Sequence, residues 1–373
     1  MRSSSGEHYI ALDHIRAVAI FLVFSWHFMH WATGYPVPFT FTPAPAVFPL
    51  AILDEGHTGV ALFMTLSGYL FAKLLDGKQL RYRAFLWNRF LRLVPLYVAV
   101  LFVIGIQMWF QGWTPRVYLG YLASGIPNPS LLPAGGWSIA AEAHFYVLLP
   151  LLLWAGRKSK WALPACLGAA ILFRVFLYLH FREIKILAYA TIIGRLDQFL
   201  LGIMAFQSRH LFTHRHRIAA IGVLLFAAFY WWFDKRGGYY NLSVQSPSLK
   251  SLWIILPTIE GAIYGMLIAY YESSFSLSNT GFSRILGRIG NFSYSIYLLH
   301  FFFVSQAAAF VHTRIMDISN FYVASLWALV CFALMIPIGL ISFNFIERPF
   351  LKFRRKYGVA IHTAVESQQH PGS

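Results

Sequence analysis

The stretch LDHIRAVAIFLVFSWHFMHW, residues 12–31, decides the fold because it has the length and apolar content of a membrane-spanning helix. Such a helix needs about 17–25 apolar residues. The stretch nevertheless contains Arg16 and His27. Ionisable side chains are costly in hydrocarbon, so they mark candidate functional sites. We therefore expect a membrane protein whose functional site lies inside its helix bundle.

The composition extends this expectation to the whole chain. Of 373 residues, 58% are hydrophobic and 12% are charged, whereas a soluble domain is about 25% charged. We expect an all-α, polytopic membrane bundle of about ten transmembrane helices, forming one domain over residues 1–357 and followed by a disordered polar tail over 358–373. The expected spans are residues 10–31, 58–75, 94–113, 137–156, 161–180, 186–207, 218–233, 252–271, 290–311 and 322–345.

Basic residues predict the orientation, because Lys and Arg are retained on the cytoplasmic side. With both termini cytoplasmic, 19 of the 30 Lys and Arg residues lie on that side. The net charge of +16 then reflects topology, and no nucleic acid partner is expected. Cys166 and Cys331 both lie in apolar spans, so we expect no disulfide framework.

The polar residues of the first span have an informative spacing. Arg16 and His27 are eleven residues apart, which places them within about 20° of one helix face and about 16 Å apart along the axis. One face would present a cation near the cytoplasm and a proton acceptor near the outside. Alternatively, neighbouring helices satisfy both residues. His30 lies about 60° round the helix from His27. It is the reserve candidate for the proton acceptor, should His27 prove dispensable.

Glu142, in GGWSIAAEAHFYVLLPLLL, is the candidate partner of His27. Counted inward from interfacial tryptophans, the two residues lie at depths that agree within about 1.5 Å. A carboxylate beside an imidazole orients it as a general base. The alternative is a structural glutamate that pairs with Arg174 or Arg195.

The segment RYRAFLWNRFLRLVP, residues 81–95, contains Arg81, Arg83, Arg89 and Arg92. As a cytoplasmic loop it would anchor the protein at the membrane surface, or it would bind a polyanion, because guanidinium groups suit phosphates. Pro95 is expected near the start of the third helix. Two further features, Ser67-Gly68 and the series Tyr294, Tyr297 and His300, are compatible with packing alone.

In order along the chain, these segments resemble acyltransferase family 3, whose members transfer acyl groups to hydroxyls of envelope glycans and related acceptors. The resemblance covers nearly the whole chain. It rests on LDHIRAVAIFLVFSWHF, GVALFMTLSGYL, RFLRLVPLY, WSIAAEAHFY, GRLDQFLLG, SYSIYLLH and FIERPF.

The resemblance implies a multi-pass protein of a bacterial inner or plasma membrane, in contact with lipid. It would use acyl-CoA, most simply acetyl-CoA, as co-substrate, a saccharide as acceptor and no metal. The four arginines of residues 81–95 would hold the CoA phosphates while the pantetheine arm passes Arg16.

His27 would be the base, oriented by Glu142, or would form a transient acyl-histidine. Arg195 or Tyr297 would stabilise the oxyanion, and His300 and Ser67 would support the acceptor. The outer loops, residues 32–57 and 115–136, would shape the acceptor site.

Two other classes use the same residue types. A proton-coupled transporter, or a flippase for a lipid-linked sugar, also places Arg, His and Glu in a bundle, but it does not require the arginine-rich segment. A purely structural scaffold leaves the buried charges unexplained.

Overall fold

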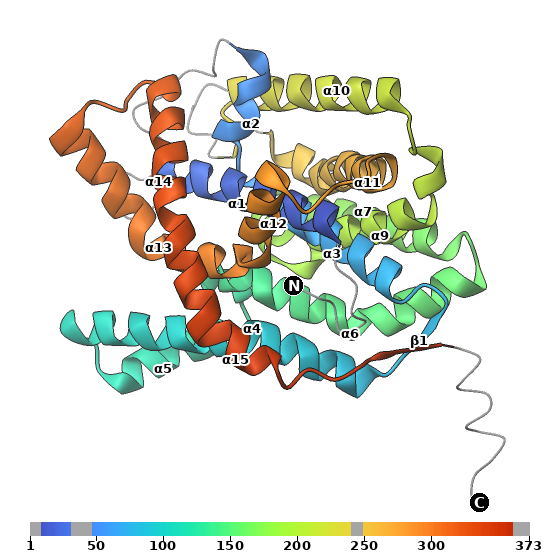
Figure 1. Cartoon of the computed structure of the whole chain (residues 1–373), viewed down its shortest axis with the longest axis horizontal. Coiled ribbons are helices and arrows are strands. Elements are labelled where there is room, and N and C mark those ends of the chain that lie inside the picture. The colour runs from blue at the N-terminus through green and yellow to red at the C-terminus, as the bar shows by residue number, and fades with distance from the viewer. Residues whose placement is uncertain (1–8, 31–46, 240–248, 361–373) are drawn as a thin grey trace, which may run out of the picture.

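The computed structural model describes residues 9–30, 47–239 and 249–360, and these residues form a helical bundle (Figure 1). Within them, seven helical segments are long and apolar enough to cross a membrane. They are α1 (Ile10–Met29), α4 (Tyr82–Phe110), α6 (Gly136–Lys158), α7 (Ala162–Phe181), α10 (His216–Lys235), α13 (Ser293–Phe310) with the π-helical turn η5 (Val311–Ile315), and α14 (Phe321–Ser342) with η6 (Phe343–Glu347) and α15 (Arg348–Leu351). The expected all-α membrane bundle is confirmed.

The three other expected spans are also helical, but they are shorter or more polar. They form α3 (Thr58–Leu74), α9 (Ile192–Gln207) and α11 (Leu256–Ser274). The count of ten spans and the orientation stay predictions. Short elements connect the helices: η1 (Phe48–Leu50), α2 (Ala51–Asp54), α5 (Pro115–Ser124), η2 (Pro129–Leu131), α8 (Lys185–Ala190), η3 (Arg209–Leu211), η4 (Leu249–Ile254) and α12 (Gly281–Asn291).

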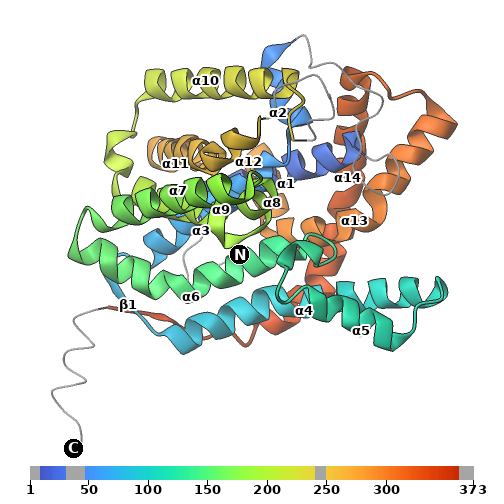
Figure 2. The ribbon, with the colours of Figure 1, turned by 180° about the vertical axis from the view of Figure 1, so that it is seen from behind.

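The first helix lies at the centre of the bundle. Helix α1 packs against α3, α12, α13 and α14 (Figure 1), and most of its apolar stretch is buried. Because neighbouring helices surround it, the polar residues of α1 face protein. At the periphery, Figure 2 shows α5 beside the C-terminal half of α4. There the Tyr118 hydroxyl donates to the Leu101 carbonyl at 2.6 Å.

Close packing of α3 against α9 depends on glycine. A Cβ on Gly68 would lie 2.1 Å from the carbonyl oxygen of Phe199, and a Cβ on Gly202 would lie 2.1 Å from that of Thr65. Small residues let membrane helices approach each other this closely. The packing role considered for Ser67-Gly68 is confirmed for Gly68.

The arginine-rich segment is helical, which corrects its expected loop structure. Helix α4 begins at Tyr82 and Pro95 lies inside it, because membrane helices tolerate proline where neighbours satisfy the backbone. Arg83, Arg89 and Arg92 are therefore fixed on one helix.

The expected single span over residues 186–207 is broken at Thr191, whose backbone is extended between α8 and α9. The Thr191 hydroxyl accepts a hydrogen bond from the Ile193 backbone N–H at 3.2 Å and so begins α9. The carbonyl of Tyr189, freed by the break, accepts a hydrogen bond from Arg195 Nε at 2.7 Å.

The start of the predicted tail pairs with the main body. Strand β2 (Gly358–Ala360) is antiparallel to β1 (Lys78–Leu80), in the register Gln79 opposite Val359. The remaining tail, residues 361–373, lies outside the described residues.

Candidate functional site

A cavity of about 210 Å³ lies among α1, α3, α4, α6, α13 and the segment after α15. A cavity needs a volume of roughly 10–15 Å³ to hold one water molecule. This cavity therefore has room for part of a larger ligand. Six of the residues predicted for the site line it: Arg16, Ser67, Arg89, Arg92, Glu142 and Tyr297.

The cavity is long. On α3 its lining runs from Val60 to Leu74, which is about 21 Å of helix at 1.5 Å per residue. At one end lie Arg89, Arg92 and Arg354, which we call the arginine end. At the other end lie Ser138 and Tyr297.

The arginine end gathers three positive charges, and the described residues pair one of them with a carboxylate. Arg92 pairs with the buried Glu347 at 3.0 Å. Arg89 Nε and Arg354 Nε are buried and have no hydrogen-bond partner among the described residues. Burial, followed by the charges of Arg92 and Arg89, lowers the pKa of Arg354 to about 9. Guanidinium groups suit anions such as phosphate, so the arginine end is a candidate anion site.

Arg354 was not among the residues predicted for the site. Its signal in the sequence is the run FRRK after FIERPF, which by itself indicates only topology. The approach of residues 354–357 to α4 is a long-range contact: the Asn88 side chain donates to the Arg355 carbonyl at 2.7 Å. Conversely, Arg81 and Arg83 are exposed and do not line the cavity.

Arg16 lines the cavity, and its role in donor binding stays a prediction. It forms an ion pair with Asp13, one turn earlier on α1, and is half-buried. Asp13 neutralises part of its charge, so the interpretation of Arg16 as a residue satisfied by a neighbour also has support.

Glu142 faces the cavity, but its contact differs from the one expected. Its Oε1 accepts a hydrogen bond from the Ser67 hydroxyl at 3.2 Å. The arginines considered as its partners lie elsewhere: Arg174 binds Asp197 at 2.9 Å, and Arg195 faces Glu260 at 3.9 Å. The expected hydrogen bond between Glu142 and His27 is not found among the described residues.

His27 contacts His300 instead. The distance from His300 Nε2 to His27 Nδ1 is 3.2 Å, and the two rings meet edge to face. His27 is half-buried and His300 is fully buried. The sequence placed both residues in the site without predicting their contact, because they are 273 residues apart.

Tyr297 closes the cavity one helical turn before His300. Its hydroxyl lies 2.8 Å from the Ser138 hydroxyl and 3.2 Å from the Gly135 carbonyl. Gly135 has a φ of +72°, and a Cβ there would lie 2.5 Å from the Tyr297 hydroxyl. Because Gly135 has no Cβ, the Tyr297 hydroxyl can approach it and close this end of the cavity.

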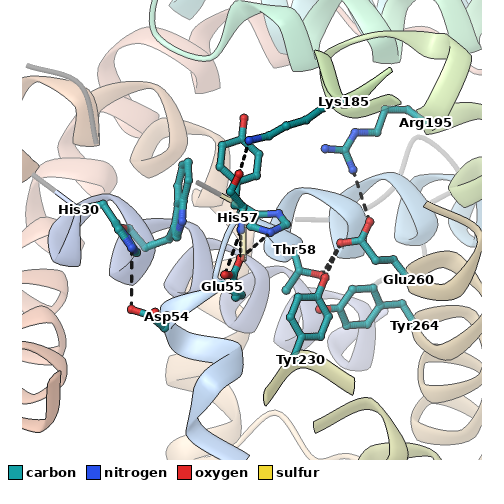
Figure 3. A network of polar contacts seen from close by, with 12 residues as sticks. His30, Asp54, Glu55, His57, Thr58, Lys185, Arg195, Tyr230, Glu260 and Tyr264 are labelled. Carbon is teal, nitrogen blue, oxygen red and sulfur yellow. Dashed lines mark hydrogen bonds and ion pairs between the residues drawn. The ribbon is translucent and has the colours of Figure 1, made fainter. Parts of the chain in front are cut away.

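A second polar network lies apart from the cavity lining (Figure 3). Glu260 accepts hydrogen bonds from Thr58 at 2.7 Å, Tyr230 at 2.7 Å and Gln198 at 2.9 Å. Arg195, in the first turn of α9, points at Glu260 (Figure 3). Arg195 therefore joins elements of the bundle. It is not among the residues that line the cavity, and its role as an oxyanion residue stays a prediction.

The same network continues past Thr58 to charged residues beside α2. Glu55 accepts from the Tyr239 backbone N–H at 3.1 Å and faces His57 at 3.0 Å. His30, the reserve candidate, faces Asp54 at 3.8 Å (Figure 3). Burial, and then the charge of Asp54, raises the pKa of Glu55 to about 8.

Parts of the expected site lie outside the described residues. Of the expected outer loops, residues 32–46 belong to this group. Residues 47–57 include η1 and α2, and residues 115–136 include α5 and η2. In the part of the chain that the structure describes, no group of three or more His, Cys, Asp or Glu side chains could hold a metal ion.

Comparison with known proteins adds independent findings. The model of acyltransferase family 3, described as an acyltransferase domain, matches residues 9–343. The chain is also similar to the peptidoglycan O-acetyltransferase OatA of Listeria monocytogenes, with 24% identity over 398 positions. That alignment covers 93% of this chain and 56% of the relative, so this chain spans little more than half of the relative's length. No solved structure matches the chain.

Proposed function

This chain belongs to acyltransferase family 3, and from that membership we propose that it is a membrane-bound O-acyltransferase. It moves an acyl group, most simply acetyl, from cytoplasmic acyl-CoA to a hydroxyl of a cell-envelope saccharide. The observation that carries the proposal is the long cavity, which has arginines at one end and the Tyr297–His300–His27 series beyond the other.

The cavity suits the shape and charge of acyl-CoA. The nucleotide end of CoA carries several phosphate charges, which Arg89, Arg92 and Arg354 would bind. Its pantetheine arm is thin and would follow α3 toward Tyr297. The cavity follows α3 for about 21 Å. This length suits the pantetheine arm, which holds the thioester far from the phosphates.

The arginine end is the cytoplasmic end in this proposal. Basic residues concentrate there, as the positive-inside rule requires, and the C-terminal strand β2 lies on the same side as β1. The donor then enters from the compartment that supplies CoA thioesters, and the acceptor meets the acyl group near the opposite surface.

The chemistry requires one base. His27 takes the proton of the acceptor hydroxyl, whose oxygen attacks the thioester carbonyl carbon. The carbon–sulfur bond then breaks, and the proton passes to the leaving sulfur. Ser138 and Tyr297 hydroxyls at the end of the cavity can donate to the oxyanion. Glu142 and Ser67 would contact the arm of the donor rather than His27.

The nature of the acceptor is supported by similarity. The relative from Listeria monocytogenes is named as a peptidoglycan O-acetyltransferase, so we propose a hydroxyl of an envelope saccharide as acceptor. The membrane is the bacterial inner or plasma membrane, where CoA and envelope precursors face opposite sides.

Reconstituted protein incubated with acetyl-CoA labelled in the acetyl group tests the proposal. We expect label on the saccharide acceptor, and loss of labelling in a folded His27→Ala protein. Saccharide movement across the vesicle membrane without label on the saccharide would instead support a transporter or flippase and would overturn the proposal.

A further inference from the structure

The ring of His300 is oriented by backbone carbonyls. Its Nδ1 lies 2.5 Å from the Tyr297 carbonyl oxygen and 3.3 Å from that of Ile296. A carbonyl oxygen only accepts, so Nδ1 carries the hydrogen. In the neutral ring the lone pair therefore lies on Nε2, the atom that contacts His27.

His27 is fixed in the complementary way. Its Nδ1 lies 2.8 Å from the Val23 carbonyl oxygen and 3.2 Å from His300 Nε2. Both neighbours accept, so the hydrogen of His27 is on Nδ1 and its lone pair is on Nε2. Among the described residues, no hydrogen bond is made to His27 Nε2, which leaves that atom available to act as a base.

We infer that His300 is the positioning residue of the base: it holds His27 in the Nδ1–H form and stabilises the imidazolium that forms during transfer. This inference rests on the proposed function. When His27 Nε2 takes the hydroxyl proton, the Nδ1–H of the cation still points at two acceptors. The Nε2 proton then moves to the departing thiolate, and the starting form of His27 returns.

An imidazole in this place differs physically from a carboxylate. A buried carboxylate would bring a second charge into the bundle, at a considerable desolvation cost. Neutral His300 offers a lone pair without that charge, and its own N–H is satisfied by the Tyr297 carbonyl. His300 thus takes the place expected for Glu142, which instead binds Ser67.

Two substitutions test the inference. His300→Leu removes the acceptor, whereas His300→Gln can place an amide oxygen near the position of Nε2. We expect His300→Leu to lower kcat for acyl transfer by about 10²-fold, in the range of general-base effects, with an unchanged KM for acetyl-CoA. His300→Gln should recover at least about tenfold of that loss. His144→Leu, at an exposed position of α6, is the matched control and should keep full kcat.

The outcomes separate this inference from the proposed function. If wild-type protein transfers acetyl groups and His300→Leu retains its kcat, the positioning role is wrong while the function stands. Equal losses in His300→Leu and His300→Gln, or a loss confined to KM, would also overturn the role. If wild-type protein transfers no acetyl group, the function itself fails.

A measurement on the wild-type protein covers the case in which the two His300 variants do not fold. Nitrogen-15 NMR of histidine-labelled protein distinguishes protonated from unprotonated ring nitrogens, and the His27 signals are assigned by their loss in His27→Gln. We expect His27 to be protonated at Nδ1 and unprotonated at Nε2. The opposite form, with hydrogen on Nε2, would contradict the inference.

Discussion

Arg354 is the residue whose surroundings most directly predict a ligand. It lies half-buried beside Arg89 and Arg92, whose charges, together with partial burial, lower its pKa. Removing one of three crowded cations should relieve repulsion in the empty protein and weaken binding of a polyanion. We therefore expect Arg354→Gln to raise the melting temperature without ligand by roughly 1–3 °C and to lower CoA affinity at least about tenfold.

Thermal unfolding of detergent-purified protein, with and without CoA, checks both signs. Arg83→Gln is the matched control, because Arg83 is exposed on the same helix α4 and does not line the cavity. It should change neither quantity. A normal CoA-induced shift in Arg354→Gln would remove Arg354 from the donor site.

Arg195 separates a structural role from a catalytic one. Its Nε satisfies the Tyr189 carbonyl at the break between α8 and α9, and it stacks over the Tyr189 ring at 4.5 Å. Arg195→Lys should therefore lower the melting temperature, because lysine cannot reproduce this planar set of contacts. The folded fraction should keep its turnover rate within about threefold. A roughly hundredfold slower transfer, as expected on removal of an oxyanion donor, with unchanged melting would restore the catalytic role.

At the residue scale, the sequence identified polar groups better than it identified their partners. Arg16, Glu142 and Tyr297 were recognised because polar residues in apolar stretches are conspicuous, and all three line the cavity. Their contacts depend on which helices are neighbours, which residue spacing within one helix does not reveal. The His27–His300 contact and the approach of Arg354 both arise this way.

The α3–α9 interface yields a prediction at the scale of elements. Because a Cβ on Gly68 would lie 2.1 Å from a backbone oxygen of α9, Gly68→Ala must push the two helices apart. We expect a destabilisation of about 1–3 kcal/mol, measured as a lower melting temperature in detergent.

Gly168→Ala provides the comparison within another helix. A Cβ on Gly168, in α7, would have no atom within 4 Å, and alanine favours helix over glycine by up to about 1 kcal/mol. That variant should melt at the wild-type temperature or slightly above it. Equal destabilisation by the two substitutions would show that Gly68 does not set the helix distance.

Apolar length predicted the helices well and their interruptions poorly. Each expected span holds a helix, because a stretch in hydrocarbon must satisfy its own backbone. The break at Thr191 was missed because Arg195, six residues further on, satisfies the Tyr189 carbonyl, a side-chain contact that apolar length does not reveal. The early start of α4 was missed because Pro95 resembled a helix beginning, although its neighbours tolerate it within the helix.

For the whole molecule, the prediction concerns its orientation in the membrane. Helix α4, of 29 residues, is about 43 Å long and exceeds the hydrocarbon thickness of roughly 30 Å. Arg83 and Gln111 are exposed at its two ends. With Cys166 and Cys331 replaced by alanine, Arg83→Cys should react with an impermeant maleimide only from the cytoplasmic side, and Gln111→Cys only from the outside. Reaction of both from one side would refute the orientation.

In the proposed function, the cavity carries an acyl-CoA from the arginine end toward His27. The most direct measurement is a structure of the protein bound to a ketone analogue of acetyl-CoA, which cannot transfer its acyl group. We expect the phosphates at Arg89, Arg92 and Arg354, and the carbonyl beyond Glu142, at the end formed by Ser138 and Tyr297. A nucleotide bound outside the arginine end, or a carbonyl remaining beside those arginines, would contradict it.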